Sequence, residues 1–208
     1  MYQLEELDVN RFVKVLMLQK NKSHWEDYWQ NLYDQMHVNE FKIQKWWGSK
    51  VDLIGKSVSI LNSGIGFYSV PLCVEKGAKS VNTYDMCPVT ADIAKDAHWV
   101  SNYDNYNHNV LDIVFDSHVF AENPDQVYIN TSCEHSYLMR DVIPNNVEVI
   151  LSGNDLTKRG HINKINSIDQ LAYRAGVTEI IFEDEMVFEY EDDLGSRHYK
   201  QFLLYGKK

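Results

Sequence analysis

One stretch of the chain, residues 57–85, constrains the fold more than any other. A mainly apolar run at 58–61 predicts a short strand that is covered on both faces of a sheet. The turn Asn62–Gly66 follows, with residue types that tolerate positive φ, and a helical apolar run comes after it. A second strand, Ser80–Tyr84, then leads into Asp85. The order strand, glycine turn, helix, strand and acid indicates the first βαβ unit of an open parallel sheet.

The carboxyl ends of the strands in such a sheet are where ligands collect, because glycines there let the backbone approach a ligand closely. Asp85 lies about twenty residues beyond Gly64 and Gly66, the spacing at which an acid after the second strand binds ribose hydroxyls in dinucleotide folds. The unit therefore fits a nucleoside. The pattern lacks a third glycine, since Tyr68 stands near that place, so a strand-to-helix turn without a ligand is the alternative.

Composition indicates one domain and argues against a nucleic-acid partner. With 208 residues, 44% of them hydrophobic, the chain is large enough for one buried core and short for two. The net charge is −10, and the run Glu179–Asp193 holds eight acids without a base. A strong non-specific hold on a phosphate backbone is therefore not expected. No apolar segment approaches the length of a membrane span, so we expect a soluble cytoplasmic protein with no membrane partner.

Cysteine and histidine spacing signals neither a disulfide framework nor a metal site. Cys73, Cys87 and Cys133 lie far apart without a C-x-x-C pair, which is typical of reduced thiols in a cytosol. The eight histidines show no ligand spacing such as H-E-x-x-H. We therefore expect no metal site.

Residues 1–50 are predicted to form a helical extension ahead of the main domain, residues 51–208. A capping-box sequence begins at Ser23, and aromatic residues then recur at helical spacing. Four of the five tryptophans lie between Trp25 and Trp47. One interpretation is that these aromatic side chains pack onto the sheet as core. The other is that part of the stripe forms a lid over the substrate, or contacts a partner subunit in an oligomer.

Two further strands are predicted in the middle of the chain. The apolar run 110–115 suggests a third strand, with Asp112 either on its edge or at its functional end. The run 127–130 predicts a fourth strand, and the polar or small residues 131–135 follow it. Such a polar stretch after a buried strand is typical of a loop that forms a site, although it is also compatible with a simple connection.

The last third of the chain completes an alternating pattern. A fifth strand is expected at 147–151, followed by a long polar loop through His161 and Asn163. Ser167 begins a capping box, and two β-rich runs joined at 192–195 predict a hairpin. The whole order predicts an α/β fold, a three-layer αβα sandwich with a mostly parallel seven-stranded sheet and a C-terminal antiparallel hairpin.

In this order and at these spacings, the chain from Ser57 to Lys208 resembles the class I S-adenosylmethionine-dependent methyltransferases, which have a Rossmann-like fold. The resemblance is carried by the turn Leu61–Gly66 and by Asp85. It is also carried by Asp125-Gln126-Val127 before a strand that leads to Glu134-His135. The resemblance implies that S-adenosylmethionine is the cofactor.

The resemblance further implies a cofactor-binding set that follows the carboxyl ends of the first four strands: Asn62, Gly64, Gly66, Asp85, Met86, Asp112 and Ser132. In this set the glycine turn borders the methionine part, Asp85 binds the ribose hydroxyls, Asp112 faces the adenine amino group and Ser132 lies beside the sulfonium. The chain departs from the family's pattern at two positions. Asn62 replaces an acid that normally helps to hold the cofactor's α-amino group, and Tyr68 replaces the last glycine.

Methyl transfer is an in-line displacement at a sulfonium, so an enzyme gains most by aligning the nucleophile and excluding water. A general base is needed only for a protonated nucleophile. His135 is the predicted base because its unperturbed pKa lies near neutrality, and Glu134 is expected to orient it or to act instead. A structural, hydrogen-bonding histidine is the alternative. Asn154, His161 and Asn163 are expected to contact the substrate, with a solvated loop as the alternative.

The acceptor is expected to be a small molecule or a protein. Residues 130–133 read Asn-Thr-Ser-Cys, where amino-methylating nucleic-acid enzymes carry an Asp/Asn-Pro-Pro-aromatic loop. Two other functions stay open. One is a different S-adenosylmethionine reaction on the same fold, such as aminopropyl-type transfer. The other is a binding or assembly protein that keeps the fold and has lost the chemistry.

Overall fold

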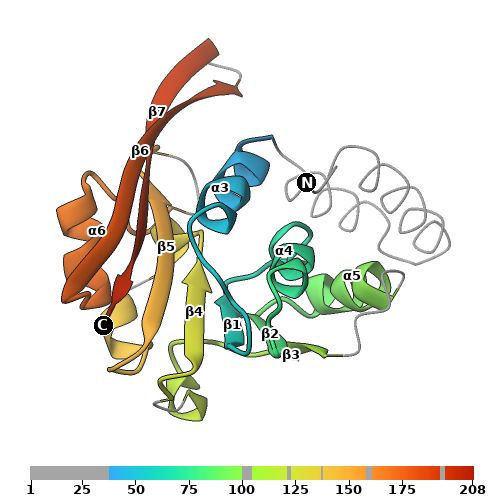
Figure 1. Ribbon diagram of the computed structural model, residues 1–208. Helices are drawn as coiled ribbons and strands as arrows, with labels where there is room; N and C mark the ends of the chain where they lie inside the picture. Colours follow the sequence, from blue (N-terminus) through green and yellow to red (C-terminus); the bar gives the residue numbers. More distant parts are fainter. Residues whose placement is uncertain (1–37, 100–104, 121–122, 137, 158–160, 193–194) are drawn as a thin grey trace, which may run out of the picture.

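The protein is an α/β sandwich whose central sheet has seven strands in the order β3-β2-β1-β4-β5-β7-β6. The computed structural model describes residues 38–99, 105–120, 123–136, 138–157, 161–192 and 195–208. Strands β1 to β5 pair in parallel, whereas β7 is antiparallel to both β5 and β6. Helices lie on both faces of the sheet (Figure 1). The predicted three-layer sandwich with a C-terminal hairpin is confirmed.

The described elements follow one another in alternating order. They are α3 (Val38–Gly48), β1 (Ser57–Leu61), α4 (Ser69–Glu75), β2 (Ser80–Asp85), α5 (Pro88–Trp99), β3 (Tyr106–Val110), η1 (Ser117–Val119), β4 (Gln126–Asn130), η2 (Cys133–His135), η3 (Met139–Asp141), β5 (Glu148–Asn154), α6 (Ile168–Ala175), β6 (Glu179–Asp192) and β7 (Gly195–Lys207).

The central strands are buried on both faces, as their apolar runs predict. One core cluster lies under α3 and α4: Ile43, Trp46, Trp47, Val58, Ile60, Val70, Cys73, Val127, Ile129 and Ile150 belong to it. The other lies under α6, and it contains Leu61, Tyr128, Val149, Leu151, Leu171, Ala172 and Ala175. Neighbouring residues of β4 and β5 thus alternate between the two clusters, which is the period of a strand.

Helix α3 is part of the main core, and its two tryptophans, Trp46 and Trp47, pack onto the sheet. Trp47 is fully buried, and its Nε1 donates a hydrogen bond to Oε1 of Gln44 at 2.6 Å. Trp46 donates to Asp184 of β6 at 2.9 Å. The predicted helix after Ser23, with Trp25, lies outside the described residues. The division of the chain into residues 1–50 and 51–208 stays a prediction.

The predicted capping box at Ser167 is confirmed, and a glycine and a proline mark two other helix ends. Ser167 caps α6 by accepting a hydrogen bond from the backbone N–H of Gln170 at 3.1 Å. Gly176 ends the same helix in the left-handed conformation, with φ of 75°. Pro88 is the first residue of α5, where its missing N–H costs little.

The third strand was predicted in the wrong place. It is Tyr106–Val110, whereas the apolar run 111–115 forms turns in which Phe115 is exposed. Strand β3 lies at the edge of the sheet and pairs only with β2; its residues are exposed or half-buried and mostly polar, so they give no apolar signal. Asp112 was predicted either on the edge of this strand or at its functional end. It lies just beyond the carboxyl end of β3, which agrees with the second position.

The fifth strand is longer than predicted. It continues from the expected run to Asn154, because Ser152, Gly153 and Asn154 pair with β7. Gly153 suits this position, since a Cβ there would lie 2.6 Å from a side-chain carbon of Ile165. Asn154 is consequently the last residue of a strand and not part of a loop.

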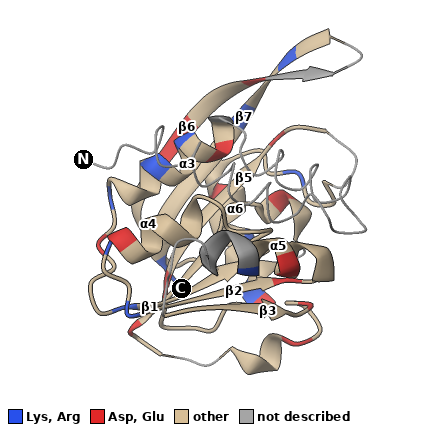
Figure 2. Ribbon diagram, turned by 90° about the vertical axis from the view of Figure 1, so that its right-hand side faces the viewer, with Lys and Arg blue, Asp and Glu red and all other residues tan. Residues whose placement is uncertain are grey.

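Strands β6 and β7 form a hairpin that extends beyond the rest of the sheet (Figures 1 and 2). Both acidic and basic residues lie along it (Figure 2), and Lys200 pairs with Glu185 at 2.6 Å. Charged side chains on an edge strand discourage pairing with another chain. Within the described residues, every helix is too short or too polar to cross a membrane.

Candidate functional site

The turn after β1 keeps its backbone in the left-handed region at alternate residues. Asn62, Gly64 and Gly66 have φ of 49°, 52° and 61°. Asparagine and glycine are the residue types that accept this conformation most readily. At Gly66 a Cβ would also lie 2.8 Å from Cγ2 of Val70, so a side chain there would push α4 away from the turn. The sequence pattern Asn-x-Gly-x-Gly is thus required by the backbone.

Asp85, at the end of β2, holds this turn. Its Oδ2 accepts the N–H of Gly64 at 2.9 Å, and its Oδ1 accepts the N–H of Cys87 at 2.9 Å and the hydroxyl of Thr90 at 3.2 Å. A carboxylate has about four acceptor positions, so these bonds leave room for another donor. The carboxylate therefore faces the glycine turn, where the sequence predicts a sugar.

A hollow of about 330 Å³, part of it open to solvent, lies beside the turn. Its lining comes from the carboxyl ends of β1 and β4 and from helices α3 and α4: Glu40, Ile60, Asn62, Ser63, Phe67, Tyr68, Ser69, Thr131 and Ser132. Two residues of the predicted cofactor set, Asn62 and Ser132, are among them. The predicted set and the hollow thus lie at the same edge of the sheet.

Glu40 is a residue of this hollow that the sequence patterns missed. Its Oε1 accepts hydrogen bonds from Nε2 of Gln44 at 2.5 Å and from the hydroxyl of Thr131 at 3.2 Å. Burial raises the pKa of Glu40, and these two hydrogen bonds oppose the shift. No motif marked Glu40, because it reaches the hollow from α3, outside the βαβ unit.

The predicted adenine side of the site is more exposed. Met86 follows β2 with 70% of its surface exposed, and it does not line the hollow. Asp112 accepts the N–H of Val114 at 3.0 Å and that of Phe115 at 3.4 Å, so its carboxylate closes a local turn. The contact of Met86 with the cofactor and that of Asp112 with the adenine amino group stay predictions.

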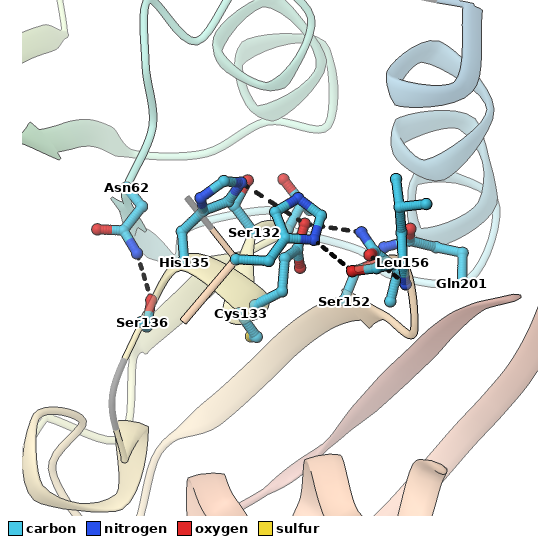
Figure 3. A network of polar contacts seen from close by, with 12 residues as sticks. Asn62, Ser132, Cys133, His135, Ser136, Ser152, Leu156 and Gln201 are labelled. Carbon is cyan, nitrogen blue, oxygen red and sulfur yellow. Dashed lines mark hydrogen bonds and ion pairs between the residues drawn. The ribbon is translucent and has the colours of Figure 1, made fainter. Parts of the chain in front are cut away.

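Ser136 connects the glycine turn with the loop after β4. Its hydroxyl accepts hydrogen bonds from the amides of Asn62 and Asn130, the first of which is drawn in Figure 3. The sequence patterns did not mark Ser136, because it lies just beyond the polar run 131–135. The Asn62 amide therefore faces the β4 loop, and Asn62 does not supply the negative charge that an acid would have at this position.

Glu134 is a buried carboxyl group with one well-defined partner. It lies in η2, only 5% exposed, and its Oε1 accepts a hydrogen bond from Nδ2 of Asn154 at 2.8 Å. Burial raises the pKa of Glu134 to about 8, and the charge of Glu40 adds to the rise. The carboxyl group is therefore mainly in its acid form at neutral pH.

His135 and His161 come together above Glu134, although 26 positions separate them in the sequence. Their ring centroids are 4.7 Å apart at an interplanar angle of 81° (Figure 3). The His135 Nε2 atom lies 3.9 Å from Oε1 of Glu134, which is contact but too long for a hydrogen bond. The His135 side chain is 46% exposed, so an acceptor can reach it.

Asn163 links the loop after β5 to the loop after β4 by hydrogen bonds. Its backbone N–H donates to the carbonyl of Glu134 at 3.0 Å, and its Nδ2 donates to the carbonyl of Ser136 at 2.9 Å. Arg174 in turn donates to the carbonyl of Asn163 at 3.1 Å. These bonds hold the two loops together, while substrate contacts of Asn163, Asn154 and His161 stay predictions.

Comparisons with known proteins show the fold. Neither a protein-family model nor a curated protein matches the chain. The structure of the YcgJ protein from Bacillus subtilis has a TM-score of 0.63 at 10% identity, over 81% of this chain and 98% of that one. Magnesium protoporphyrin IX methyltransferase from Synechocystis with bound SAH has a TM-score of 0.59 at 14% identity, over 93% and 100%. The chain has a Rossmann-like methyltransferase fold.

A further solved structure agrees. Ribosomal protein L11 methylase from Lactobacillus delbrueckii has a TM-score of 0.53 at 12% identity, over 83% of this chain and 80% of that one. The named enzymes with this fold thus include one for a porphyrin and one for a protein. Likeness at such identities concerns the fold, so an activity has to be argued from the residues of the site.

Proposed function

We propose that the protein is an S-adenosylmethionine-dependent methyltransferase that acts on a small molecule or a protein. The observation that carries this proposal is the pairing of the Asp85 carboxylate with the N–H of Gly64. It puts an acceptor for ribose hydroxyls next to a turn in which Gly64 and Gly66 adopt positive φ. The neighbouring hollow would take the methionine part of the cofactor.

The charges around the hollow favour a cationic cofactor. The charge of Glu40 adds to the rise in the pKa of Glu134, so the two carboxyl groups lie near each other. A sulfonium beside them would stabilise their ionised forms by opposite charge. A bound nucleotide triphosphate would instead bring like charge to the same place, and S-adenosylmethionine carries no phosphate.

His135 is the proposed general base. It is accessible to an acceptor, and Glu134 and His161 contact its ring from the inner side. An acceptor with a hydroxyl, thiol or protonated amine would lose its proton to the imidazole as it attacks the methyl carbon, and the sulfur would keep the electron pair of the broken bond. The net charge of −10 supports an acceptor other than nucleic acid.

Calorimetric titration with S-adenosylmethionine and S-adenosylhomocysteine tests the proposal. We expect saturable binding of both, weakened at least about tenfold in Asp85→Ala, because the variant loses a charged acceptor for the ribose. Asp125→Ala is the matched control, since Asp125 is an exposed aspartate that does not line the hollow. Absence of binding at millimolar ligand would refute the proposal.

The spent cofactor separates the enzymatic alternatives. Mass spectrometry after turnover should detect S-adenosylhomocysteine, whereas methylthioadenosine would indicate aminopropyl-type transfer. The replacement of the usual acid by Asn62 favours a third possibility, a binding or assembly module without chemistry. A stable complex of the chain with no affinity for either nucleoside would support that module.

A further inference from the structure

Three potential metal ligands meet beyond the carboxyl ends of β4 and β5, at the same edge of the sheet as the glycine turn and Asp85. The ligand atoms of Glu134, His135 and His161 all lie within 4.8 Å of one another. They come from η2 after β4 and from the loop after β5. Ligands of a tetrahedral zinc ion are about 3.3 Å apart at bond lengths near 2.0 Å, so side-chain rotations would close the cluster around an ion.

The buried carboxyl of Glu134 lacks a partner on one side. Its Oε1 is held by Asn154, but Oε2 has no hydrogen-bond partner among the described residues and is shielded from solvent. Burying a polar atom without a hydrogen-bond partner costs free energy, and few such atoms occur in native proteins. An ion in contact with Oε2 would satisfy it.

His161 is held in the tautomer that binds metals. Its Nδ1 lies 2.8 Å from the carbonyl oxygen of Leu156, and since a carbonyl can only accept, Nδ1 carries the proton. The lone pair is then on Nε2. Histidines that bind metals commonly donate their other N–H to a carbonyl or carboxylate in this way.

Asn154 orients both of these ligands. Its Oδ1 accepts the N–H of Leu156 at 3.1 Å, which leaves its Nδ2 to donate to Glu134. Asn154 thus holds Glu134 directly and His161 through the Leu156 carbonyl. Residues that bind a metal are commonly oriented by hydrogen bonds from neighbouring groups, and Asn154 orients two of the three proposed ligands in this way.

We propose that Glu134, His135 and His161 bind a divalent transition-metal ion, with zinc as the best fit. Two imidazoles and one carboxylate suit zinc or another first-row transition metal, whereas magnesium and calcium prefer oxygen ligands. Cys133 is excluded as a ligand, because its thiol is buried and directed to the carbonyl of Asn130 at 3.4 Å.

Such a set leaves at least one coordination position for another ligand. If the proposed methyltransferase function holds, that position takes an oxygen or nitrogen atom of the acceptor, and the ion, as a Lewis acid that lowers the acceptor's pKa, replaces His135 in the role of general base. This role depends on the proposed function. Metal binding itself does not, and it is measured without S-adenosylmethionine.

The test is a titration of the full chain with zinc after treatment with a chelator. We expect one zinc ion per chain, and an affinity reduced at least about tenfold in Glu134→Gln and in His161→Gln. His198→Gln is the matched control, since His198 is a histidine of β7 whose side chain is 66% exposed. Cobalt added to the wild-type protein should give the intense visible absorption of a four- or five-coordinate site.

A wild-type protein that binds no zinc, or that binds it as tightly after both substitutions, would overturn the proposal. If the variants fold poorly, measurements on the wild-type protein alone still test the proposal. Its melting temperature should rise with zinc concentration, and a flat response together with a pale octahedral cobalt spectrum would contradict the site. Titration of the same chelator-treated protein with S-adenosylhomocysteine tests the proposed function separately.

Discussion

The carboxylate of Asp85 joins the two turns that face the nucleoside half of the site. It accepts three hydrogen bonds, from the backbone of Gly64 and Cys87 and from the Thr90 hydroxyl. Asp85 therefore has a structural function in addition to the proposed contact with ribose. A change at this residue should alter stability as well as binding.

We predict that Asp85→Ala lowers the free energy of unfolding by about 1–3 kcal/mol, since two backbone N–H groups lose a charged acceptor. Urea denaturation followed by circular dichroism measures this. Asp125→Ala should stay within about 0.5 kcal/mol of the wild type, as an exposed aspartate does. Equal stability of the wild type and Asp85→Ala would mean that water replaces the carboxylate at no cost.

His108 should make the protein sensitive to acid. Its Nδ1 lies 2.7 Å from the Thr83 hydroxyl and 3.2 Å from that of Tyr106. Burial lowers the pKa of His108; the charge of Asp85 partly offsets this, and that of Lys95 adds to it. The unfolded chain then binds more protons than the folded one, so stability is full above the unfolded pKa, about 6.5, and is lost as the pH falls below it.

The corresponding prediction concerns the slope of stability with pH. Between pH 7 and pH 5 the free energy of unfolding should fall less in His108→Gln than in the wild type. His118→Gln serves as the control, because His118 is exposed. Identical slopes in His108→Gln and the wild type would show that the imidazole has the same pKa in the folded and the unfolded protein.

Helix α3 connects three parts of the molecule. Asn39 donates to the Tyr199 hydroxyl of β7 at 3.2 Å, Gln44 donates to Thr131 after β4 at 3.4 Å, and Trp46 donates to Asp184 of β6. The helix therefore fixes the hairpin relative to the hollow, in addition to covering the sheet.

Replacing Trp47 by alanine should destabilise the protein by about 3–5 kcal/mol, because a fully buried indole leaves a cavity in the core. Thermal and urea unfolding report the loss. Lys45→Ala, on the exposed side of the same helix, should have little effect. If Trp47→Ala lowers the free energy of unfolding by less than about 1 kcal/mol, α3 contributes little to the stability of the core.

Elements with a strong local pattern could be predicted from the sequence. The strand before the glycine turn is apolar because it is buried on both faces, and the ends of α6 are marked by Ser167 and Gly176. Strand β3 could not be predicted, since an edge strand with the sequence Tyr-Asn-His-Asn-Val shows no apolar periodicity. The apolar run at 111–115 gave the stronger but misleading signal.

The sequence could predict which candidate site residues lie close together only within one βαβ unit. Asn62, Gly64, Gly66 and Asp85 follow one another at a spacing that the strand and helix lengths impose. The cluster of Glu134, His135 and His161 depends on contacts between two loops, and no spacing rule describes those contacts. Histidine spacing therefore predicted no metal site, whereas the geometry of the loops brings three potential ligands together.

At the scale of the whole molecule, the two halves of the site occupy one edge of the sheet. The nucleoside half follows β1 and β2, and the proposed metal half follows β4 and β5. The hydrogen bond from Asn62 to Ser136 is the direct contact between them. Because β1 and β4 are neighbours, a ligand in one half lies next to a ligand in the other.

This arrangement predicts separable but coupled binding. Asp85→Ala should lose S-adenosylhomocysteine and keep zinc, and His161→Gln should do the reverse. Zinc should change the affinity for S-adenosylhomocysteine by the same factor by which the nucleoside changes the affinity for zinc, since coupling free energies are reciprocal. Ser136→Ala removes the contact between the halves and should bring that factor close to one. Loss of both ligands in either of the first two variants, measured on folded protein, would instead indicate a single undivided site.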